Sequence, residues 1–575
     1  MKTISIDLGT YNSAVAYRTA SGEVRLAQAY HGPTFQGSLV PSFLKFLANG
    51  ELEKYGELAR EEVEVFPQLV VWGLKRLLGK SYQDAREEFS RFHYPLREAE
   101  DGSIEIPIGN RVYTPIEQTA LFLRKIKDDC ENRALNPELG GPIERAIITH
   151  PAYFDCGQRA AIKEAALGDQ VGFKSVEMIS EPEAAALAYR DFIDFSQRPL
   201  VMVIDWGAGT LDIVILRFSL DEKGQPIVDS VYAPYGDTQL GGIDMDDVLL
   251  KRGEIVLGLT DVDSVAEAKL RFEIERLKIR LSSTSWEQRF YSLGSKGYSL
   301  KFARKKGDVA AGENEKEWVF LEETLAPILR LFRDKLEASL DKHGLTPDII
   351  DGLLLVGGPM YMPCVRGVVR DVFKDNPAVI AQLERWDTGF PVSPLEAVAR
   401  GALLKDIVMG DIGNRTPYAY GFMLDDKILP RMIIEENTIV PNTGIHKESD
   451  IFTCRSGHVM QISLYKRADH IHFRKGCYKK TAVASPGKPY SVKFALDMDG
   501  DQICTLKIYE IEPGKEKIAI NQKTRRSAEK PVLELKIIQD REDEIPNPES
   551  LDPDLLDKLR DRKIQEYMEA GLSKE

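Results

Sequence analysis

Two segments of the sequence share a plan that suits phosphate binding: an apolar run ends in aspartate, and a glycine turn and a threonine follow. They are Ile4-Ser5-Ile6-Asp7-Leu8-Gly9-Thr10 and Val201-Met202-Val203-Ile204-Asp205-Trp206-Gly207-Ala208-Gly209-Thr210. Glycine lets backbone N–H groups turn inward and approach a phosphate closely. Carboxylates together with phosphate oxygens and water are the ligands that Mg²⁺ prefers. The pattern therefore predicts a phosphate site at which Asp7 and Asp205 hold Mg²⁺ through its water shell.

Either turn alone is weak support, because most Asp-x-Gly turns are purely structural. The chain has no Walker A motif and no GxGxxG motif, so neither common nucleotide loop is present. Two echoing copies predict instead a duplicated lobe whose turns face a central cleft. A third turn, Val356-Gly357-Gly358-Pro359, suits either a nucleoside lying flat on the backbone or a tight strand-to-helix connection.

Residues 1–407 have the pattern of a mixed α/β domain that positions these turns. Short apolar runs at 145–149, 200–204 and 353–356 predict buried strands. An apolar stripe from Ala266 to Ser282 predicts an amphipathic helix. Ser180, with Glu183 three residues later, predicts a helix that begins with a capping box.

The pattern changes after a glycine-containing linker at 408–415. From 416 to 522 polar and apolar residues alternate between recurring turn residues, which predicts an all-β sandwich. Residues 523–575 are polar and predict one amphipathic helix, capped by Asp552 and stopped by Gly571.

The amino-acid composition of the chain disfavours several classes of binding partner and cellular location. The net charge of −14 disfavours nucleic acid and anionic membranes as general partners. No apolar run reaches the roughly 20 residues of a membrane helix. The 6 cysteines form no CxxC pair, and no leader precedes the apparent strand at Ile4, so we expect reduced thiols in a cytoplasmic protein.

The order of further motifs resembles the seventy-kilodalton heat-shock chaperones, the DnaK-like family within the actin, sugar-kinase and heat-shock ATPase superfamily. The matching segments are Ile6–Ser13 and Asp205–Asp212 for the two phosphate motifs, Lys75–Gly79 for the catalytic lysine, Pro151–Phe154 with Arg159 for the hinge, Glu181–Tyr189 for a connecting helix, Gly236–Gly242 for the segment after the second phosphate motif, and Glu275–Ser283 for the helix over the nucleoside. The sandwich matches more loosely, with early strands at 431–434 and 437–441 and a next hairpin formed by 451–452 and 459–465.

This resemblance implies an α/β actin-like two-lobed ATPase domain, an all-β peptide-binding sandwich and a short helical tail in place of a full lid. It implies a chaperone that hydrolyses ATP to ADP and phosphate with Mg²⁺ and thereby controls the binding of extended client polypeptide. A J-domain co-chaperone and a nucleotide exchange factor are the further partners that it implies. Two other hypotheses stay open: a nucleotide-binding scaffold or exchange-type co-chaperone with weak or no hydrolysis, and a filament-forming actin relative.

The resemblance also assigns roles to residues. Lys75 would orient the attacking water, Glu181 would position that water and the metal shell, and Asp7, Asp205 and Thr210 complete the catalytic set. The nucleotide-binding residues that it implies are Gly9, Thr10, Tyr11, Gly207, Ala208, Gly209, Thr210, Gly241, Gly242, Glu275, Lys278, Ser282, Gly357, Gly358 and Tyr361. Pro151 and Arg159 would relay nucleotide state to the sandwich.

Several positions depart from the family pattern. Tyr11 stands where a small hydroxyl residue is usual, and Ala208 replaces a glycine. Ile279 and Tyr361 replace arginines that enclose adenine, and Leu395 replaces an acidic residue. Two lost cations weaken the adenosine clamp, so we expect looser ATP affinity than is typical of the family. The linker also lacks the family's run of leucines, which predicts weaker docking between the domains.

Overall fold

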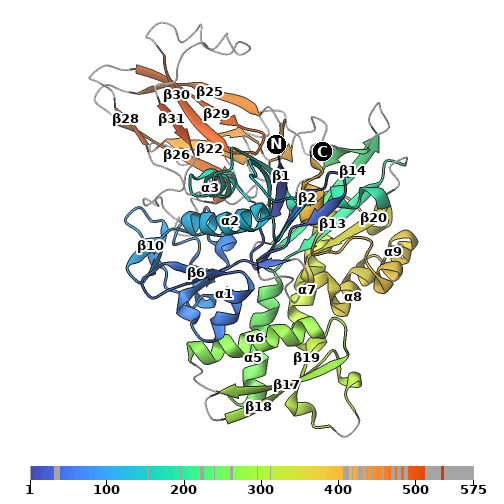
Figure 1. Cartoon of the computed structure of the whole chain (residues 1–575). Coiled ribbons are helices and arrows are strands. Elements are labelled where there is room, and N and C mark those ends of the chain that lie inside the picture. Colours follow the sequence, from blue (N-terminus) through green and yellow to red (C-terminus); the bar gives the residue numbers. More distant parts are fainter. Residues whose placement is uncertain are drawn as a thin grey trace, which may run out of the picture.

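Two similar half-domains and a β-sandwich are visible in the computed structural model (Figure 1). The structure describes residues 2–30, 39–152, 154–193, 197–220, 226–232, 234–237, 240–259, 263–293, 296–310, 313–405, 414–416, 419–424, 431–435, 438–441, 444–454, 459–467, 473–474, 481–484, 490–511 and 533–536. The linker residues 408–413 and the helix expected between Asp552 and Gly571 lie outside these described residues.

The first lobe is built on a 6-stranded sheet that presents the first turn. Its order is β12-β11-β1-β2-β3, and β4 pairs with β2. The strands are β1 (Thr3–Asp7), β2 (Asn12–Arg18), β3 (Val24–Leu26), β4 (Val40–Pro41), β11 (Arg145–His150) and β12 (Ser175–Ser180). β1 runs antiparallel to β2 and parallel to β11, so the glycine turn joins two strands whose central residues are buried.

The second lobe repeats this arrangement. In its 5-stranded sheet β13 (Leu200–Trp206) runs antiparallel to β14 (Leu211–Leu220) and parallel to β20 (Gly352–Val356). β15 (Pro226–Val231) and β16 (Tyr235–Asp237) complete the sheet on the β14 side. The internal echo in the sequence therefore corresponds to two sheets with the same hairpin and the same parallel neighbour.

The remaining elements of the two lobes surround these sheets. In the first lobe they are β5 (Phe43–Phe46), β6 (Leu52–Tyr55), α1 (Glu57–Glu61), β7 (Val70–Trp72), the 3₁₀ turn η3 (Leu74–Arg76), β8 (Arg97–Glu98), β9 (Ile104–Ile108), β10 (Arg111–Tyr113), α2 (Pro115–Glu131) and α3 (Cys156–Leu167). In the second they are α5 (Gly242–Leu257), α6 (Ser264–Arg280), β17 (Trp286–Leu293), β18 (Lys296–Ala303), β19 (Trp318–Phe320), α7 (Leu321–Asp341), α8 (Pro363–Val372) and α9 (Pro377–Thr388). The helix expected at 266–282 is α6, which begins and ends two residues earlier.

Two helices cross between the lobes. α4 (Glu181–Ala188) begins at Ser180, whose hydroxyl accepts from the Glu183 N–H in the capping box that the sequence predicts. α10 (Ala397–Ala402) lies against α4 at Gly401, where an added methyl carbon would sit 1.6 Å from the Ala184 carbonyl oxygen. A side chain at Gly401 would therefore push the crossing helices apart, and with them the lobes.

The sandwich consists of two main sheets, which confirms the all-β prediction for the described part of this region. One sheet has the order β23-β22-β26-β27, with β28 on β26, and the other has the order β25-β29-β30-β31. The strands are β21 (Asn414–Arg415), β22 (Ala419–Leu424), β23 (Arg431–Ile434), β24 (Ile439–Val440), β25 (Ile445–Cys454), β26 (Val459–Arg467), β27 (Phe473–Arg474), β28 (Thr481–Ala484), β29 (Tyr490–Met498), β30 (Cys504–Ile511) and β31 (Leu533–Lys536).

Two expectations about this region are corrected. The hairpin expected from 451–452 and 459–465 is wrong, because β25 pairs with β29 and β26 pairs with β22 in the other sheet. The chain changes sheets at that connection, which an alternating pattern alone cannot distinguish from a hairpin. In addition, β31 lies within the expected polar tail and pairs with β30. Among the helices that the structure describes, none has the length and apolar character that crossing a bilayer requires.

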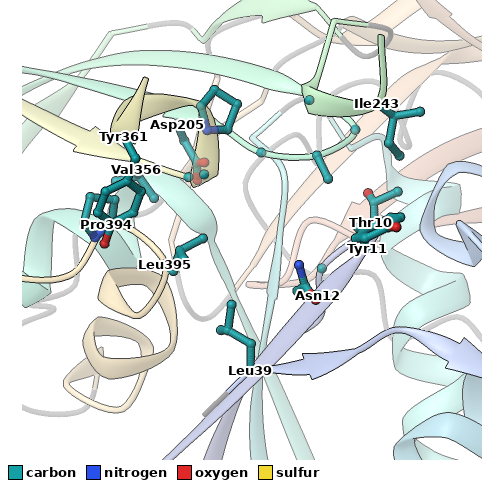
Figure 2. Close-up of a pocket in the computed structure, with 18 of the residues that line it drawn as sticks. Thr10, Tyr11, Asn12, Leu39, Asp205, Ile243, Val356, Tyr361, Pro394 and Leu395 are labelled. Atoms are coloured by element: carbon teal, nitrogen blue, oxygen red, sulfur yellow. The ribbon is translucent and has the colours of Figure 1, made fainter. Parts of the chain in front are cut away.

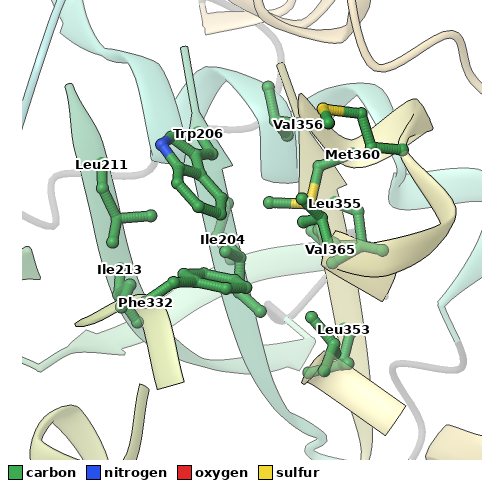
Figure 3. Close-up of a cluster of buried hydrophobic side chains, with 14 of the residues drawn as sticks. Ile204, Trp206, Leu211, Ile213, Phe332, Leu353, Leu355, Val356, Met360 and Val365 are labelled. Carbon is green, nitrogen blue, oxygen red and sulfur yellow. The ribbon is translucent and has the colours of Figure 1, made fainter. Parts of the chain in front are cut away.

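The core of the second lobe packs directly beneath its phosphate turn. Trp206, the last residue of β13, lies with its ring centroid 4.2 Å from that of Phe332 on α7. Figure 3 shows both rings among Leu211, Ile213 and the side chains of β20. The Trp206 indole N–H donates to the Leu240 carbonyl at 3.1 Å, so this buried ring leaves no donor unsatisfied.

We predict that Phe332→Ala lowers the free energy of unfolding by about 3–5 kcal/mol, because it removes a fully buried ring from a packed core. Urea denaturation followed by tryptophan fluorescence measures the change. Leu331→Ala is the matched control, since its neighbouring side chain on α7 is 41% exposed. Equal losses for the two variants would contradict this account of the core.

Candidate active site

A cleft of about 430 Å³ lies between the lobes, and both glycine turns line it. Figure 2 shows Thr10, Tyr11 and Asn12 on one wall, with Tyr361 and Pro394 on the other. Cavities of this size suit a nucleotide or another ligand of similar dimensions. All the residues assigned to catalysis or nucleotide binding from the sequence line it, except Gly241, and the relay residues Pro151 and Arg159 lie outside it.

The two phosphate turns contact each other. Gly9 donates its N–H to the Asp7 carbonyl and to the Ser13 hydroxyl, both at 3.1 Å. A methyl carbon on Gly209 would lie 2.7 Å from the Thr10 hydroxyl oxygen, so the second turn approaches the first closely. The glycines are thus required by this close approach, and both turns present backbone to one space.

Two further glycine segments rest on the second turn. Gly242 and the residue after it donate their N–H groups to the carbonyls of Gly207, at 3.0 Å, and Ala208, at 2.9 Å. An added carbon on Gly241 would lie 2.2 Å from the Ala208 carbonyl oxygen. Gly357 has φ 90°, and an added carbon there would lie 2.0 Å from the Trp206 carbonyl oxygen. Gly241 therefore supports the turn from behind, which explains its absence from the cleft wall.

A buried ion pair lies on the floor of the cleft. The Lys75 ammonium donates to Oε1 of Glu181, and their side chains are 6% and 9% exposed. Lys75 comes from η3 of the first lobe, and Glu181 is the first residue of α4. Burial lowers the pKa of Lys75, but the carboxylates of Glu181 and Asp7 outweigh that effect and raise it, so the ammonium stays charged.

Asp7 and Asp205 line the cleft beside the ion pair, and Asp212 is fully buried close to them. Burial and the Glu181 charge raise the pKa of Asp7 to about 7, although the Thr149 hydroxyl donates to its Oδ1 at 3.2 Å. Burial and the same charge raise the pKa of Asp212 to about 7. The pKa of Asp205 is raised by burial and by neighbouring carboxylates, with Glu181 first among them. An added positive charge would stabilise the ionised forms of these acid groups.

The donor set fits a hydrated divalent cation. Among the described residues, no group of three or more His, Cys, Asp or Glu side chains is arranged to hold a metal ion directly. The two strand-end aspartates Asp7 and Asp205 nevertheless have raised pKa values that a nearby cation would lower again. Hard oxygen donors that act through water are the arrangement Mg²⁺ favours beside phosphates.

The far end of the cleft is formed by α6 and by the turn after β20. Lys278 donates to the Gly242 carbonyl at 2.9 Å and pairs with Asp246 at 2.7 Å. Tyr361 shares a hydrogen bond of 3.2 Å with Ser393. Ser282 and Ile279 also line this end, so it offers apolar surface and few cations. The expectation of a loosened adenosine clamp stays a prediction.

Sequence patterns did not predict some of the residues that form or support the site. Arg76 is buried, donates to the Gly209 carbonyl at 2.8 Å, and pairs with Glu88 at 2.6 Å. Asp246 forms an ion pair with Lys278, and the Thr149 hydroxyl donates a hydrogen bond to Asp7. No local signal marks Arg76, because an arginine beside a lysine has the pattern of an exposed turn. Thr149 is the penultimate residue of β11, and the parallel pairing of β11 with β1 is what brings it beside Asp7.

The comparison with known proteins identifies the family. The family model described as Hsp70 protein matches residues 3–547. The chain belongs to the Hsp70 family. Similar proteins include the chaperone protein DnaK of Thermus thermophilus, 31% identical over 467 residues that cover 79% of this chain and 68% of the relative. The chaperone protein dnaK3 of Thermosynechococcus vestitus is 29% identical over 93% of this chain and 75% of its own length. The DnaK of Nitrosopumilus maritimus is 30% identical, with 92% and 76% covered.

Membership in this family confirms the predicted ATP-dependent chaperone and its ATPase activity. It also accounts for the two-lobed ATPase domain followed by a β-sandwich. Binding of ATP or ADP and binding of client polypeptide follow from the family as well.

The raised pKa of Asp7 predicts that the folding stability of the ligand-free protein falls as the pH rises. A carboxyl whose pKa rises from 3.8 to about 7 on folding contributes stability that is complete below its unfolded pKa and lost as pH rises through 7. Asp7→Asn stays neutral, so we expect it to raise the melting temperature at about pH 8 and to have little effect near pH 4. Scanning fluorimetry in EDTA measures this difference. The exposed Asp348→Asn serves as control, and a pH-independent effect of Asp7→Asn would contradict the prediction.

Proposed function

We propose that the cleft hydrolyses the γ-phosphate of Mg²⁺-bound ATP by in-line attack of water, and that this reaction controls the hold of the β-sandwich on extended client segments. The observation that supports the proposal most is the Lys75–Glu181 ion pair, set among strand-end aspartates below both phosphate turns. The ion pair supplies a fixed cation, and the turns supply N–H donors. Phosphoryl transfer depends mainly on such positioning and charge stabilisation.

Each side chain on the floor has a distinct task in this proposal. Glu181 fixes the Lys75 ammonium, which orients the attacking water and stabilises charge that develops on the phosphoryl oxygens. The hydroxyls of Thr10 and Thr210 line the cleft and donate to phosphate oxygens. Asp7 and Asp205 would hold hydrated Mg²⁺, which supplies the charge that offsets repulsion between the phosphate oxygens and the acids.

We predict that Lys75→Ala lowers ATP turnover by about a hundredfold or more, because it removes a preorganised cation from a buried site. A phosphate-release assay with saturating ATP and Mg²⁺ measures the loss. Lys174→Ala is the control, since this lysine pairs with Glu144 on the surface and is 70% exposed. Nucleotide binding by the parent chain without any turnover would overturn the proposed hydrolysis and favour a nucleotide-binding scaffold.

A connected set of contacts supports Pro151 and Arg159 as the proposed relay. Asp212 belongs to the acid cluster, and its Oδ1 also accepts the Ala152 N–H at 2.9 Å, directly after Pro151. The chain then enters α3, where Arg159 donates to the Gln502 side chain of the sandwich. The cleft floor and the sandwich are therefore connected through one short segment of the first lobe.

The sandwich meets α3 through the turn between β29 and β30. Lys163 contacts Asp501 as an ion pair, and Asp501 also accepts the Met178 N–H at 3.1 Å through Oδ1. The segment from Asp499 to Asp501 is thus part of the hairpin turn between β29 and β30, and this turn contacts the ATPase domain. The J-domain co-chaperone and the exchange factor enter this proposal from the family resemblance. The cytoplasmic location is proposed from that resemblance and from the four described cysteines Cys130, Cys156, Cys364 and Cys504, which form no disulfide.

We predict that Arg159→Ala leaves unstimulated ATP turnover within about twofold of the parent and removes most of its stimulation by an unfolded peptide. The reason is that Arg159 does not line the cleft and contacts the sandwich through Gln502. The measurement is steady-state turnover with and without a reduced, unfolded model polypeptide. Lys174→Ala again serves as the surface control, and full stimulation of Arg159→Ala would remove this residue from the relay.

A further inference from the structure

Tyr11 is held by the first lobe at the mouth of the first phosphate turn. Its ring meets Phe43 edge-on, with centroids 4.9 Å apart, and Trp72 at 5.8 Å. Both partners belong to the small sheet of β5, β6 and β7. The aromatic cluster therefore fixes the ring to the first lobe and leaves the hydroxyl free to point elsewhere.

The Tyr11 hydroxyl reaches across the cleft to the second lobe. It donates to Oε2 of Glu275 on α6 at 2.5 Å. The buried apolar side of α6 belongs to the core of the second lobe, through residues such as Leu270 and Ile274. One side chain thus joins the lobes beside the space where the family places the nucleoside.

Arg60 of α1 reinforces this bridge. Its guanidinium lies 5.7 Å from the Tyr11 ring centroid and 4.8 Å from that of Phe272 on α6. The same guanidinium lies 3.5 Å from Oε2 of Glu275, and the Arg60 side chain is 5% exposed. The first lobe therefore places one neutral donor and one cation around a single carboxylate of the second lobe.

We propose that Tyr11 is a positioning residue that latches the two lobes shut over the bound nucleoside and slows nucleotide release, without taking part in phosphoryl transfer. This inference rests on the proposed nucleotide function of the cleft. Opening the cleft at this end must break a hydrogen bond to a carboxylate and expose Arg60 and the aromatic rings around it. Such charge-assisted bonds are about twice as strong as neutral ones.

The latch stays intact across the neutral pH range. Burial and the Glu275 carboxylate raise the pKa of Tyr11 well above its ordinary value, and Arg60 offsets only part of this rise. The hydroxyl therefore keeps its proton and remains a donor. The charged groups that face the Tyr11 hydroxyl are Glu275, Arg60 and Asp246. Two of them, Arg60 and Glu275, also form an ion pair with each other.

The test is the release rate of a fluorescent ADP analogue from the full chain, chased with excess ADP. We expect Tyr11→Phe to release it about tenfold faster, which corresponds to about 1.4 kcal/mol. Single-turnover hydrolysis of preloaded ATP is measured in parallel, because it reports phosphoryl transfer separately from nucleotide release. Unchanged release, or a matched loss of hydrolysis, would overturn the latch.

Tyr94→Phe is the matched control, because its hydroxyl donates to the Trp72 carbonyl at 2.7 Å within the first lobe and bridges nothing across the cleft. The double variant Tyr11→Phe with Glu275→Ala tests the partner. If Glu275 is the other half of the latch, Tyr11→Phe has no further effect on release in the Glu275→Ala chain. Additive effects on the release rate would overturn the assignment. Release needs binding but no hydrolysis, so a parent chain that binds ADP without turning over ATP overturns the proposed function and leaves this test valid.

Discussion

The cleft depends on a charge imbalance that the protein cannot correct with its own floor residues. Glu181, Asp205 and Asp212 are buried near Lys75, and the partly buried Asp7 lies beside them. Lys75 neutralises one carboxylate, and the pKa values of Asp7 and Asp212 rise to about 7 because the remaining negative charge is costly there. A cation bound together with the proposed nucleotide would reduce this cost.

The two-lobed fold makes that arrangement possible. Each lobe delivers one aspartate at the end of a central strand, and neither lobe alone has both. The lobes are held at a fixed distance where α4 and α10 cross at Gly401, and they touch again where Gly209 approaches Thr10. The Tyr11–Glu275 bond lies at another part of the cleft wall. The lobes are therefore connected at the α4–α10 crossing, at the two phosphate turns and through the Tyr11–Glu275 hydrogen bond.

The local parts of this design were predictable from the sequence, and the long-range parts were not. Both glycine turns, the strands before them and the Ser180 capping box depend on neighbouring residues, so short patterns reveal them. Arg76 and Gly209 are 133 positions apart, and no periodicity connects them. Likewise, the alternation in β25 and β26 marks strands but cannot say that they belong to different sheets. The Tyr11 substitution was visible, but its partner on α6 was not.

The position of Asp212 connects the acid cluster to the proposed relay through Pro151 and Arg159. One oxygen of its carboxyl accepts the Ala152 N–H, while burial and the Glu181 charge raise the pKa of the group to about 7. An ionised carboxylate accepts a stronger hydrogen bond than a protonated one. Positive charge on the floor favours the ionised form and so tightens the attachment of the segment that leads into α3. Since α3 carries both Arg159 and Lys163 against the sandwich, a change in charge at the phosphates would, in the proposed relay, alter the contacts between α3 and the sandwich.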